Sequence, residues 1–252
     1  MKLALLSDIH ANIQAFDTCL VHAQGLGAQQ YALLGDLVGY GADPVAVVQR
    51  AQELARGGAL LIKGNHDDMA VFPPVDVKTY GETTAEWTHD QLDEAQKSFL
   101  NDLPMTLQQQ TMLLVHASMD GPELWRYVYD APAAAASLDA AAVLPEVRHV
   151  FGGHVHMQTL YCRGEDVRAG LMKFTPTPGV PLPVPSHRHW LATIGSVGQP
   201  RDGNPLAMYA MFDTERLQLT FHRVPYDHEG AAAAIRKAGL PDFMADRLGQ
   251  GR

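Results

Sequence analysis

The stretch KLALLSDIH, residues 2–10, sets a short apolar run directly against a carboxylate and an imidazole. Leu3 to Leu6 is typical of a buried strand, because it is short, continuous and apolar. Asp8 and His10 follow at once. Asp-x-His is a weak motif by itself, and it could be a helix start with an incidental histidine. The alternative is that both side chains are aimed at something charged.

The same arrangement recurs in four later stretches: YALLGDLVGY (31–40), ALLIKGNHDD (59–68), MLLVHAS (112–118) and RHVFGGHVH (148–156). Each predicts a buried strand with a polar cluster just past its carboxyl end. Helical patterns at 12–26 and 44–56 separate the first three strands, which suits βαβ units. Loops leaving the carboxyl ends of adjacent strands converge on one crevice, so we expect the clusters to meet there.

The later chain has a different pattern. HWLATIG (189–195), LAMYAMFD (206–213) and LQLTFHRV (217–224) predict strands with little helix between them, and their alternation indicates a second, more antiparallel sheet. Residues 83–103 and the alanine-rich 131–144 are typical of helices, and the proline-rich 175–189 of a loop. We expect one domain over residues 1–252, with helical insertions near 69–103 and 119–144.

Composition narrows the function. The 252 residues are 46% apolar and 19% charged, with a net charge of -9, which argues against broad binding to long nucleic acid or to an anionic membrane. Two cysteines, Cys19 and Cys162, do not make a disulfide framework. No apolar run approaches the length of a membrane span. We therefore expect a cytoplasmic protein, and the sequence leaves its oligomeric state undetermined.

Taken together, the polar clusters form a set of metal ligands. In extended backbone, residues i and i+2 point to the same side, so Asp8 with His10, and His154 with His156, can each face one point. Glycines before Asp36, Asn65 and His154 permit close approach. The pooled set suits two divalent ions of the Mn, Fe, Zn, Co or Ni type, and its lack of cysteine argues against structural zinc. Its members are Asp8, His10, Asp36, Asn65, His116, His154 and His156.

The order of these motifs resembles the calcineurin-like metallophosphoesterase superfamily. GSVGQPRDGNP (195–205) and RVPYD (223–227) are similar to a bacterial branch of small phosphodiesterases, which includes diadenosine tetraphosphatase-like members. The resemblance implies an α/β fold, a four-layer αββα sandwich of two mixed β-sheets flanked by helices. Ala11, Ala117 and Val155 stand where relatives often have glycine, glycine and threonine, but none of these departures removes a ligand.

The resemblance also implies a role for each ligand. One metal would be held by Asp8, His10 and His156, and the other by Asn65, His116 and His154. Asp36 would bridge the two ions. His66 would stand beside the phosphate without ligating a metal.

This arrangement suits phosphoester hydrolysis. Two ions roughly 3.5–4 Å apart bind phosphate oxygens and lower the pKa of a bridging water, so that hydroxide can attack in line. We expect His66 to donate a proton or a hydrogen bond to the leaving oxygen, with Asp67 orienting its ring. Arg201, Asn12 and Tyr40 are candidate substrate contacts. Arg201 could instead form a surface ion pair with Asp202, and Asn12 and Tyr40 could serve helix start and packing.

The sequence thus predicts a dinuclear metal-dependent phosphodiesterase acting on a small, nucleotide-type phosphoester, with Mn or Fe favoured. A phosphomonoesterase or protein phosphatase is an alternative within the same chemistry. A non-catalytic scaffold of the same fold is an alternative of another class. A scaffold is free to lose ligands, and here every ligand position is filled.

Overall fold

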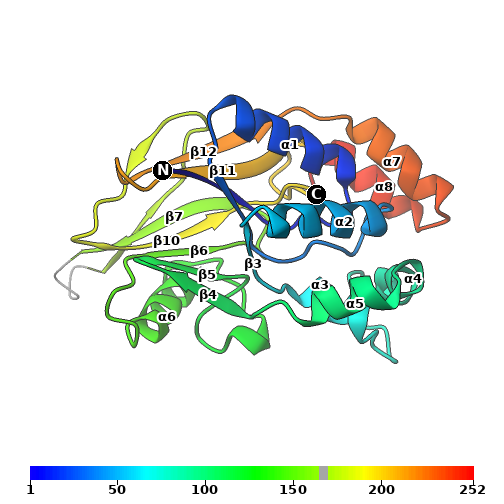
Figure 1. Ribbon diagram of the computed structural model, residues 1–252, viewed down its shortest axis with the longest axis horizontal. Helices are drawn as coiled ribbons and strands as arrows, with labels where there is room; N and C mark the ends of the chain where they lie inside the picture. The colour runs from blue at the N-terminus through cyan, green and yellow to red at the C-terminus, as the bar shows by residue number, and fades with distance from the viewer. Residues whose placement is uncertain (165–169) are drawn as a thin grey trace.

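The protein is described here by a computed structural model that covers residues 1–164 and 170–252, and in it two mixed six-stranded sheets face each other (Figure 1). Sheet A contains, in spatial order, β3 (Leu60–Leu61), β2 (Gln30–Leu33), β1 (Lys2–Leu6), β11 (Ala207–Asp213), β12 (Gln218–Val224) and β9 (Leu182–Pro183). Sheet B contains β4 (Thr106–Gln109), β5 (Met112–Val115), β6 (His149–Gly152), β10 (His189–Ile194), β7 (Gln158–Arg163) and β8 (Leu171–Phe174).

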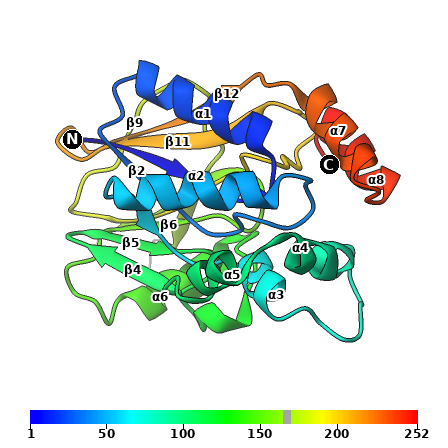
Figure 2. The same ribbon diagram turned by 45° about the vertical axis from the view of Figure 1, so that its right-hand side comes forward.

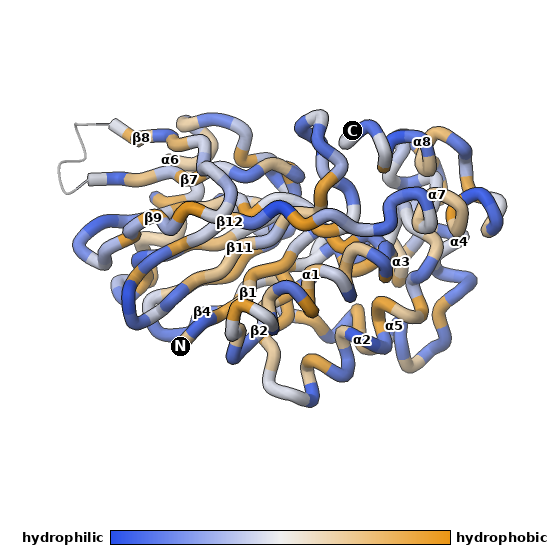
Figure 3. The backbone as a smooth tube through the Cα atoms, turned by 90° about the horizontal axis from the view of Figure 1, so that it is seen from above, coloured by the Kyte–Doolittle hydropathy of each residue, from blue (hydrophilic) through white to orange (hydrophobic). Residues whose placement is uncertain are grey.

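Strand β1 shows how the sequence builds the layers. Successive side chains of a strand point to opposite faces. Leu3 and Leu5 therefore enter the core between the sheets, where Phe151 of sheet B also lies, while Leu6 enters a second core that includes Phe16. Viewed from above, most of the tube at β1 carries the hydrophobic colour (Figure 3). A strand buried on both faces must be apolar throughout, as residues 3–6 are.

Helices complete a four-layer sandwich. Helices α1 (Ile13–Gly25) and α2 (Pro44–Arg56) share the outer core of sheet A, and α6 (Ala131–Ala141) shares the outer core of sheet B. Figure 2 shows the order helix, sheet, sheet, helix from top to bottom. The αββα architecture expected from the sequence is confirmed.

Further helices gather at one end of the molecule. They are α3 (Asn65–Val71), α4 (Ala85–Gln91), α5 (Glu94–Asn101), α7 (His228–Lys237) and α8 (Asp242–Gln250), with short 3-10 turns at Glu82–Thr84 and Pro122–Leu124. Helices α7 and α8 share a small core with Tyr40. Within the described part of the chain, no helix is both long and apolar enough to cross a membrane.

Three expectations need correction. Strands β11 and β12 do not belong to a separate second sheet, because β11 pairs antiparallel with β1 and joins sheet A. Residues 83–103 form two helices, since the Asp93 carboxylate accepts from the Gln96 amide at 2.7 Å and starts α5 anew. The proline-rich segment contributes β9, which pairs with β12. Alternation predicts a strand but not its neighbour in the sheet.

Candidate metal centre

The proposed ligands lie just past the carboxyl ends of five strands. Asp8 follows β1, Asp36 follows β2, Asn65 follows β3, His116 follows β5, and the pair His154 and His156 follows β6. Strands β1, β2 and β3 run parallel, as do β5 and β6, so their ends meet at one edge of the sandwich. All seven ligand candidates except Asn65, which is partly exposed, are buried. The structure therefore brings the whole predicted ligand set together.

The backbone of these residues is left-handed rather than extended. The φ angles are +53° at Asp8, +50° at His10, +53° at Asp36, +65° at His154 and +55° at His156. The expected extended backbone is therefore not formed at these residues, although their side chains do converge. Such conformations cost energy in residues other than glycine and persist only where the surroundings fix them.

Hydrogen bonds between the loops fix this strained backbone. The amide of His10 donates to the Asp36 carbonyl at 3.0 Å. The amide of His154 donates to the Asp8 carboxylate at 2.9 Å, and the amide of His66 donates to the Asp36 carboxylate at 2.8 Å. Each carboxylate thus ties its own loop to a second ligand loop while keeping oxygen lone pairs free for a metal.

Two glycines are required by close approach. A Cβ at Gly153 would collide with the side chains of Ser7 and Asp8. A Cβ at Gly64 would collide with the backbone and carboxylate of Asp36. Only glycine lets these loops cross so closely.

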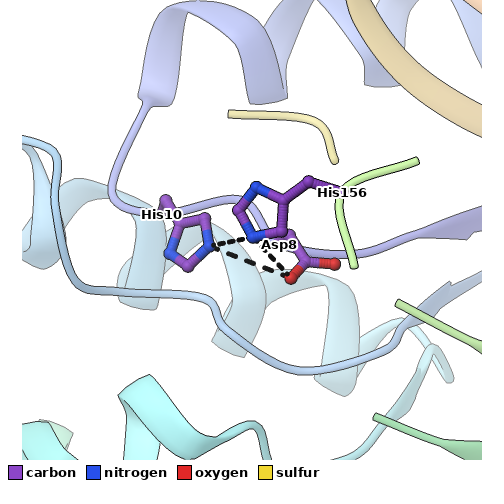
Figure 4. A group of neighbouring side chains, drawn as sticks. All are labelled: Asp8, His10 and His156. Atoms are coloured by element: carbon purple, nitrogen blue, oxygen red, sulfur yellow. Dashed lines mark hydrogen bonds and ion pairs between the residues drawn. The ribbon is translucent and has the colours of Figure 1, made fainter. Parts of the chain in front are cut away.

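One group of ligand atoms comes from Asp8, His10 and His156 (Figure 4). The Nε2 atoms of His10 and His156 lie 3.1 Å apart, and His156 Nε2 lies 3.1 Å from Asp8 Oδ1. His10 Nε2 lies 3.8 Å from the same oxygen. Two facing imidazole nitrogens and a carboxylate oxygen surround a point that suits a cation.

A second group lies beside the first. His116 Nε2 is 3.2 Å from Asp36 Oδ2. His154 offers a further nitrogen within 4.8 Å of a ligand atom of His116 and of Asp36. Asp36 Oδ2 is also 3.7 Å from His10 Nε2 of the first group. Asp36 therefore stands between the two groups, where a bridging carboxylate would have to stand.

Backbone carbonyls orient the imidazoles. The Nδ1 atoms of His10, His116 and His156 face the carbonyl oxygens of Val38, Leu34 and Gln199 at 3.2, 2.7 and 2.5 Å. An Nδ1–H donated there leaves Nε2 free as a ligand. His154 is reversed, because its Nε2 faces the Trp125 carbonyl at 2.9 Å. Its Nδ1 is then the free atom.

Buried atoms without partners support a metal site. Asn65 Oδ1 is buried and, in the described part of the chain, has no hydrogen-bond partner. His116 Nε2 is also buried, and although it lies 3.2 Å from Asp36 Oδ2, the angles do not make a hydrogen bond. Such atoms are rare in folded proteins and call for an explanation, an absent ion among them. A carbonyl-type oxygen and an imidazole nitrogen are ligands of divalent transition metals. The donor set therefore fits two such ions.

Electrostatics places most ligands in the protonation state that metal binding needs. Burial raises the pKa of Asp8 and Asp36, but the facing imidazoles outweigh it, and the pKa of each carboxyl falls below its usual value. Burial lowers the pKa of His154 to about 3. His116 is the exception: burial lowers its pKa, but Asp36 overcomes that effect and raises it to about 9. A metal would displace a proton from His116.

His66 stands beside the ligands on the wall of the pocket. Its ring centroid lies 4.9 Å from that of His10 and 4.5 Å from that of Tyr40. Burial, only partly opposed by Asp36, lowers the pKa of His66 to about 4. One His66 nitrogen also lies within 4.8 Å of donor atoms of His10 and Asp36, so position alone permits ligation as well as contact with substrate.

The hydrogen bonds of the Asp67 carboxylate go to backbone amides. The carboxylate accepts from the amides of Leu37 and Gly64 at 2.8 and 2.9 Å, and from Val38 at 3.3 Å. Among the described residues, no hydrogen bond joins it to His66. Burial raises the pKa of Asp67 to about 7, and the nearby Asp36 adds to this. Asp67 therefore holds two loops of the candidate site together, and its action on the His66 ring stays a prediction.

Asn12 is committed to the fold. Its Oδ1 accepts from the Ala15 amide at 3.1 Å, which makes it the N-cap of α1. Its Nδ2 donates to the Gly198 carbonyl at 2.9 Å and to the Tyr226 hydroxyl at 3.2 Å. These bonds fit the helix-start alternative, and the substrate contact of Asn12 stays a prediction.

Arg201 and Tyr40 do meet at the site. Arg201 Nη2 donates to Gln199 Oε1 at 2.7 Å and to the Tyr40 hydroxyl at 3.3 Å. Asp202 pairs with Arg223 instead, so the surface ion pair considered for Arg201 is not formed. The Arg201 guanidinium remains available to an anion.

A pocket of about 480 Å³ opens over the ligands and is lined by His66, Asn65 and His154. Several of its wall residues lie outside the predicted site. Tyr127 stacks on His154 with ring centroids 4.0 Å apart, and Trp125 supplies the carbonyl that His154 faces. The aromatic residues clustered in ELWRYVYD (123–130) are the sequence feature that could have indicated this part of the pocket wall. The pocket rim, as we name it, consists of Tyr40, Tyr80, Trp125, Tyr127, Arg201 and Arg247.

Comparisons with known proteins agree with this geometry. Residues 1–217 match the family described as the calcineurin-like phosphoesterase superfamily domain. A solved metallophosphoesterase from Sphaerobacter thermophilus superposes with a TM-score of 0.86 at 32% identity, covering 100% of this chain and 99% of that one. An uncharacterized protein of Methanocaldococcus jannaschii is 29% identical, covering 99% and 98%. Phosphodiesterase YfcE of Escherichia coli strain K12 is 27% identical, covering 87% and 91%.

Proposed function

The chain belongs to the calcineurin-like phosphoesterase superfamily, and from this premise we propose that it is a metal-dependent phosphodiesterase acting on a small, nucleotide-type phosphoester. One observation carries the proposal. A buried set of carboxylate, imidazole and amide ligands opens into a pocket whose walls hold aromatic rings and a guanidinium with no carboxylate partner among the described residues. We also propose that the protein is located in the cytoplasm.

The metal assignment is part of this proposal. Asp8, His10 and His156 would hold one ion, with Asn65, His116 and His154 holding the other. Asp36 would stand between them. When bound, these ions supply a hydroxide nucleophile near neutral pH and draw charge from the phosphate oxygens. Imidazole with carboxylate ligands accepts several metals, and we favour Mn or Fe.

His66 would act on the leaving group. Its ring faces the pocket and is 7% exposed, so substrate can reach it. With its pKa lowered by burial, the imidazole is neutral at pH 7 and carries one N–H. That N–H would donate to the leaving oxygen as negative charge develops there. Tyr40 packs against the ring and limits its motion.

Arg201 would hold a non-bridging oxygen of the phosphate. A guanidinium presents paired N–H donors that match phosphate geometry. Gln199 and Tyr40 fix its direction before substrate arrives, so less side-chain entropy is lost on binding.

The rim favours a diester over a monoester. A phosphodiester carries a second organic group, and the Tyr127 and Trp125 rings in the pocket wall offer it apolar surface. Nucleobases stack on such rings without needing a particular sequence of hydrogen bonds. The E. coli relative is named a phosphodiesterase, which is consistent with this choice.

The test compares bis-p-nitrophenyl phosphate with p-nitrophenyl phosphate, with added Mn²⁺ and with chelator. The variants are His66→Ala and, as a matched control, His187→Ala, whose histidine is exposed and outside the site. We expect chelator-sensitive cleavage that prefers the diester. His66→Ala should lose about 10²–10⁴-fold in kcat with its metal content unchanged.

Other outcomes of these assays would favour the alternative functions. Preference for the monoester would indicate a phosphomonoesterase or protein phosphatase. Absence of turnover on both probes, with metals bound, would indicate a scaffold. Full turnover by His66→Ala would overturn the role given to that residue.

A further inference from the structure

The C-terminal helix α8 places a second arginine at the pocket. Arg247 lines the same pocket as His66, and its guanidinium carbon lies 5.8 Å from the centroid of the Tyr40 ring. The guanidinium carbon of Arg201 lies 5.6 Å from that centroid. Two cationic groups thus share one aromatic ring beside the candidate metal centre. Residue 247 lies beyond the residues 1–217 that match the family.

The position of Arg247 is built by packing. Met244 and Leu248, on either side of it in α8, are buried in the small core that also contains Tyr40. Figures 1 and 2 both place α7 and α8 at the same end of the molecule as α3 and α4. Arg247 itself is half-buried. Its direction toward the pocket therefore follows from how the helix is anchored.

The Arg247 guanidinium has N–H donors that the fold does not use. Arg247 Nε donates to the main-chain oxygen of Arg252, the last residue of the sequence, at 2.7 Å. Across residues 1–164 and 170–252, its two Nη groups make no hydrogen bond and no ion pair, and Arg201 has no carboxylate partner there either. Burial and the charge of Arg201 both lower the pKa of Arg247, because each of them disfavours the charged form of its guanidinium.

The acidic residues of the pocket do not neutralise this pair. Asp68 lies 3.5 Å from Lys63 Nζ, and the Glu82 carboxylate accepts from the backbone amides of Lys78 and Thr79. Two like charges that line one pocket and lie over one ring, with no side-chain carboxylate partner among the described residues, favour an anionic ligand. A phosphoryl group has several oxygens and can accept from more than one guanidinium.

We propose that Arg247 and Arg201 together form a binding position for a second phosphoryl group, so that the preferred substrate carries a phosphate adjacent to the one that is cleaved. This inference rests on the proposed function and names its substrate class: a nucleotide with a phosphoanhydride chain rather than a simple diester. Arg201 spans the two positions, and Arg247 serves the second alone.

The experiment uses the Mn²⁺-loaded protein and the variants Arg247→Ala, Arg247→Lys and Arg216→Ala. Arg216 is a strongly exposed arginine of sheet A's β11–β12 turn and serves as the matched control. The probes are bis-p-nitrophenyl phosphate, with one phosphoryl group, and diadenosine tetraphosphate, with four. Inhibition of diester cleavage by ADP and by AMP gives a second readout.

We expect Arg247→Ala to lose about 10-fold or more in kcat/KM on the tetraphosphate, mainly through KM, and clearly less on the diester. Its inhibition constant for ADP should rise more than that for AMP. Arg247→Lys should recover part of both effects, and Arg216→Ala should match the parent protein. Thermal unfolding of each variant identifies any loss of α8 packing.

Failure of the inference is distinguishable from failure of the proposed function. If the parent protein cleaves the diester but Arg247→Ala changes both probes equally, the second phosphoryl position is wrong and the phosphodiesterase stands. Equal loss of ADP and AMP inhibition would overturn it in the same way. If the parent protein cleaves neither probe with metals bound, the proposed function itself is wrong.

Discussion

The metal-ligand residues and the pocket rim are built in opposite ways. The ligands sit on short loops at strand ends, are mostly buried, and are held in left-handed backbone by hydrogen bonds between loops. The rim residues come from distant segments, among them the 3-10 turn region before α6 and the last helix. The difference teaches that the chemistry of this site is local and over-determined, whereas its substrate selection depends on how separate segments pack.

The largest effect should come from the ligand that stands between both groups. Asp36→Ala removes the carboxylate facing His10 and His116 and also the acceptor of the His66 amide. We expect a loss of about 10³-fold or more in kcat/KM, together with lower metal content measured by elemental analysis. Asp102→Ala, at an exposed aspartate, is the control. If Asp36→Ala kept its metal and its activity, the contrast between the candidate ligands and the pocket rim would be wrong, because the ligand set would then not be essential.

A smaller but still large effect concerns stability. Gly153→Ala forces a methyl group against Ser7 and Asp8, so we expect a loss of about 1–3 kcal/mol in the free energy of unfolding, measured with denaturant. Gly25→Ala is the matched control, since its methyl group would meet no atom within 4 Å and should be neutral or stabilising. Equal stability of the two variants would show that the ligand loops are not tightly over-determined.

Substitutions in the pocket rim should have smaller effects on activity. Tyr127→Ala removes a ring that stacks on His154 and lines the pocket, and we expect KM for a nucleotide substrate to rise about 3- to 10-fold with little change in kcat. Tyr127→Phe keeps the ring and should retain the parent KM. A fall in kcat and metal content instead of KM would mean that Tyr127 belongs with the ligands in function and not with the rim.

The smallest effect is a pH dependence away from the site. Burial, with His22 nearby, lowers the pKa of His222 to about 4. The unfolded chain then takes up a proton near pH 6.5 that the folded chain resists, so stability falls as pH drops from about 6.5 to about 4. His222→Gln should show a shallower fall over that window in thermal unfolding. An unchanged slope would assign the acid sensitivity to the histidines of the ligand set.

The sequence by itself was enough to predict the candidate ligands of the site. Short apolar runs ending in Asp8, Asp36, Asn65, His116 and His154 specify both the strands and the candidate ligands that follow them, because the two lie within a few residues of each other. The sandwich and the family were predicted from these motifs, and the structure and the family match confirm them. The reason offered for convergence was wrong, since the loops use left-handed backbone that a pattern of residue types does not encode.

Only the tertiary structure decided the remainder. It assigned β11 to the sheet of β1, committed Asn12 to a helix start and Asp67 to backbone amides, and brought Arg247 across the chain to Tyr40. Each of these outcomes joins residues far apart in the sequence or depends on which of several partners a polar group meets. Local pattern states what a residue can do, whereas packing over long sequence separations selects which of those roles it takes.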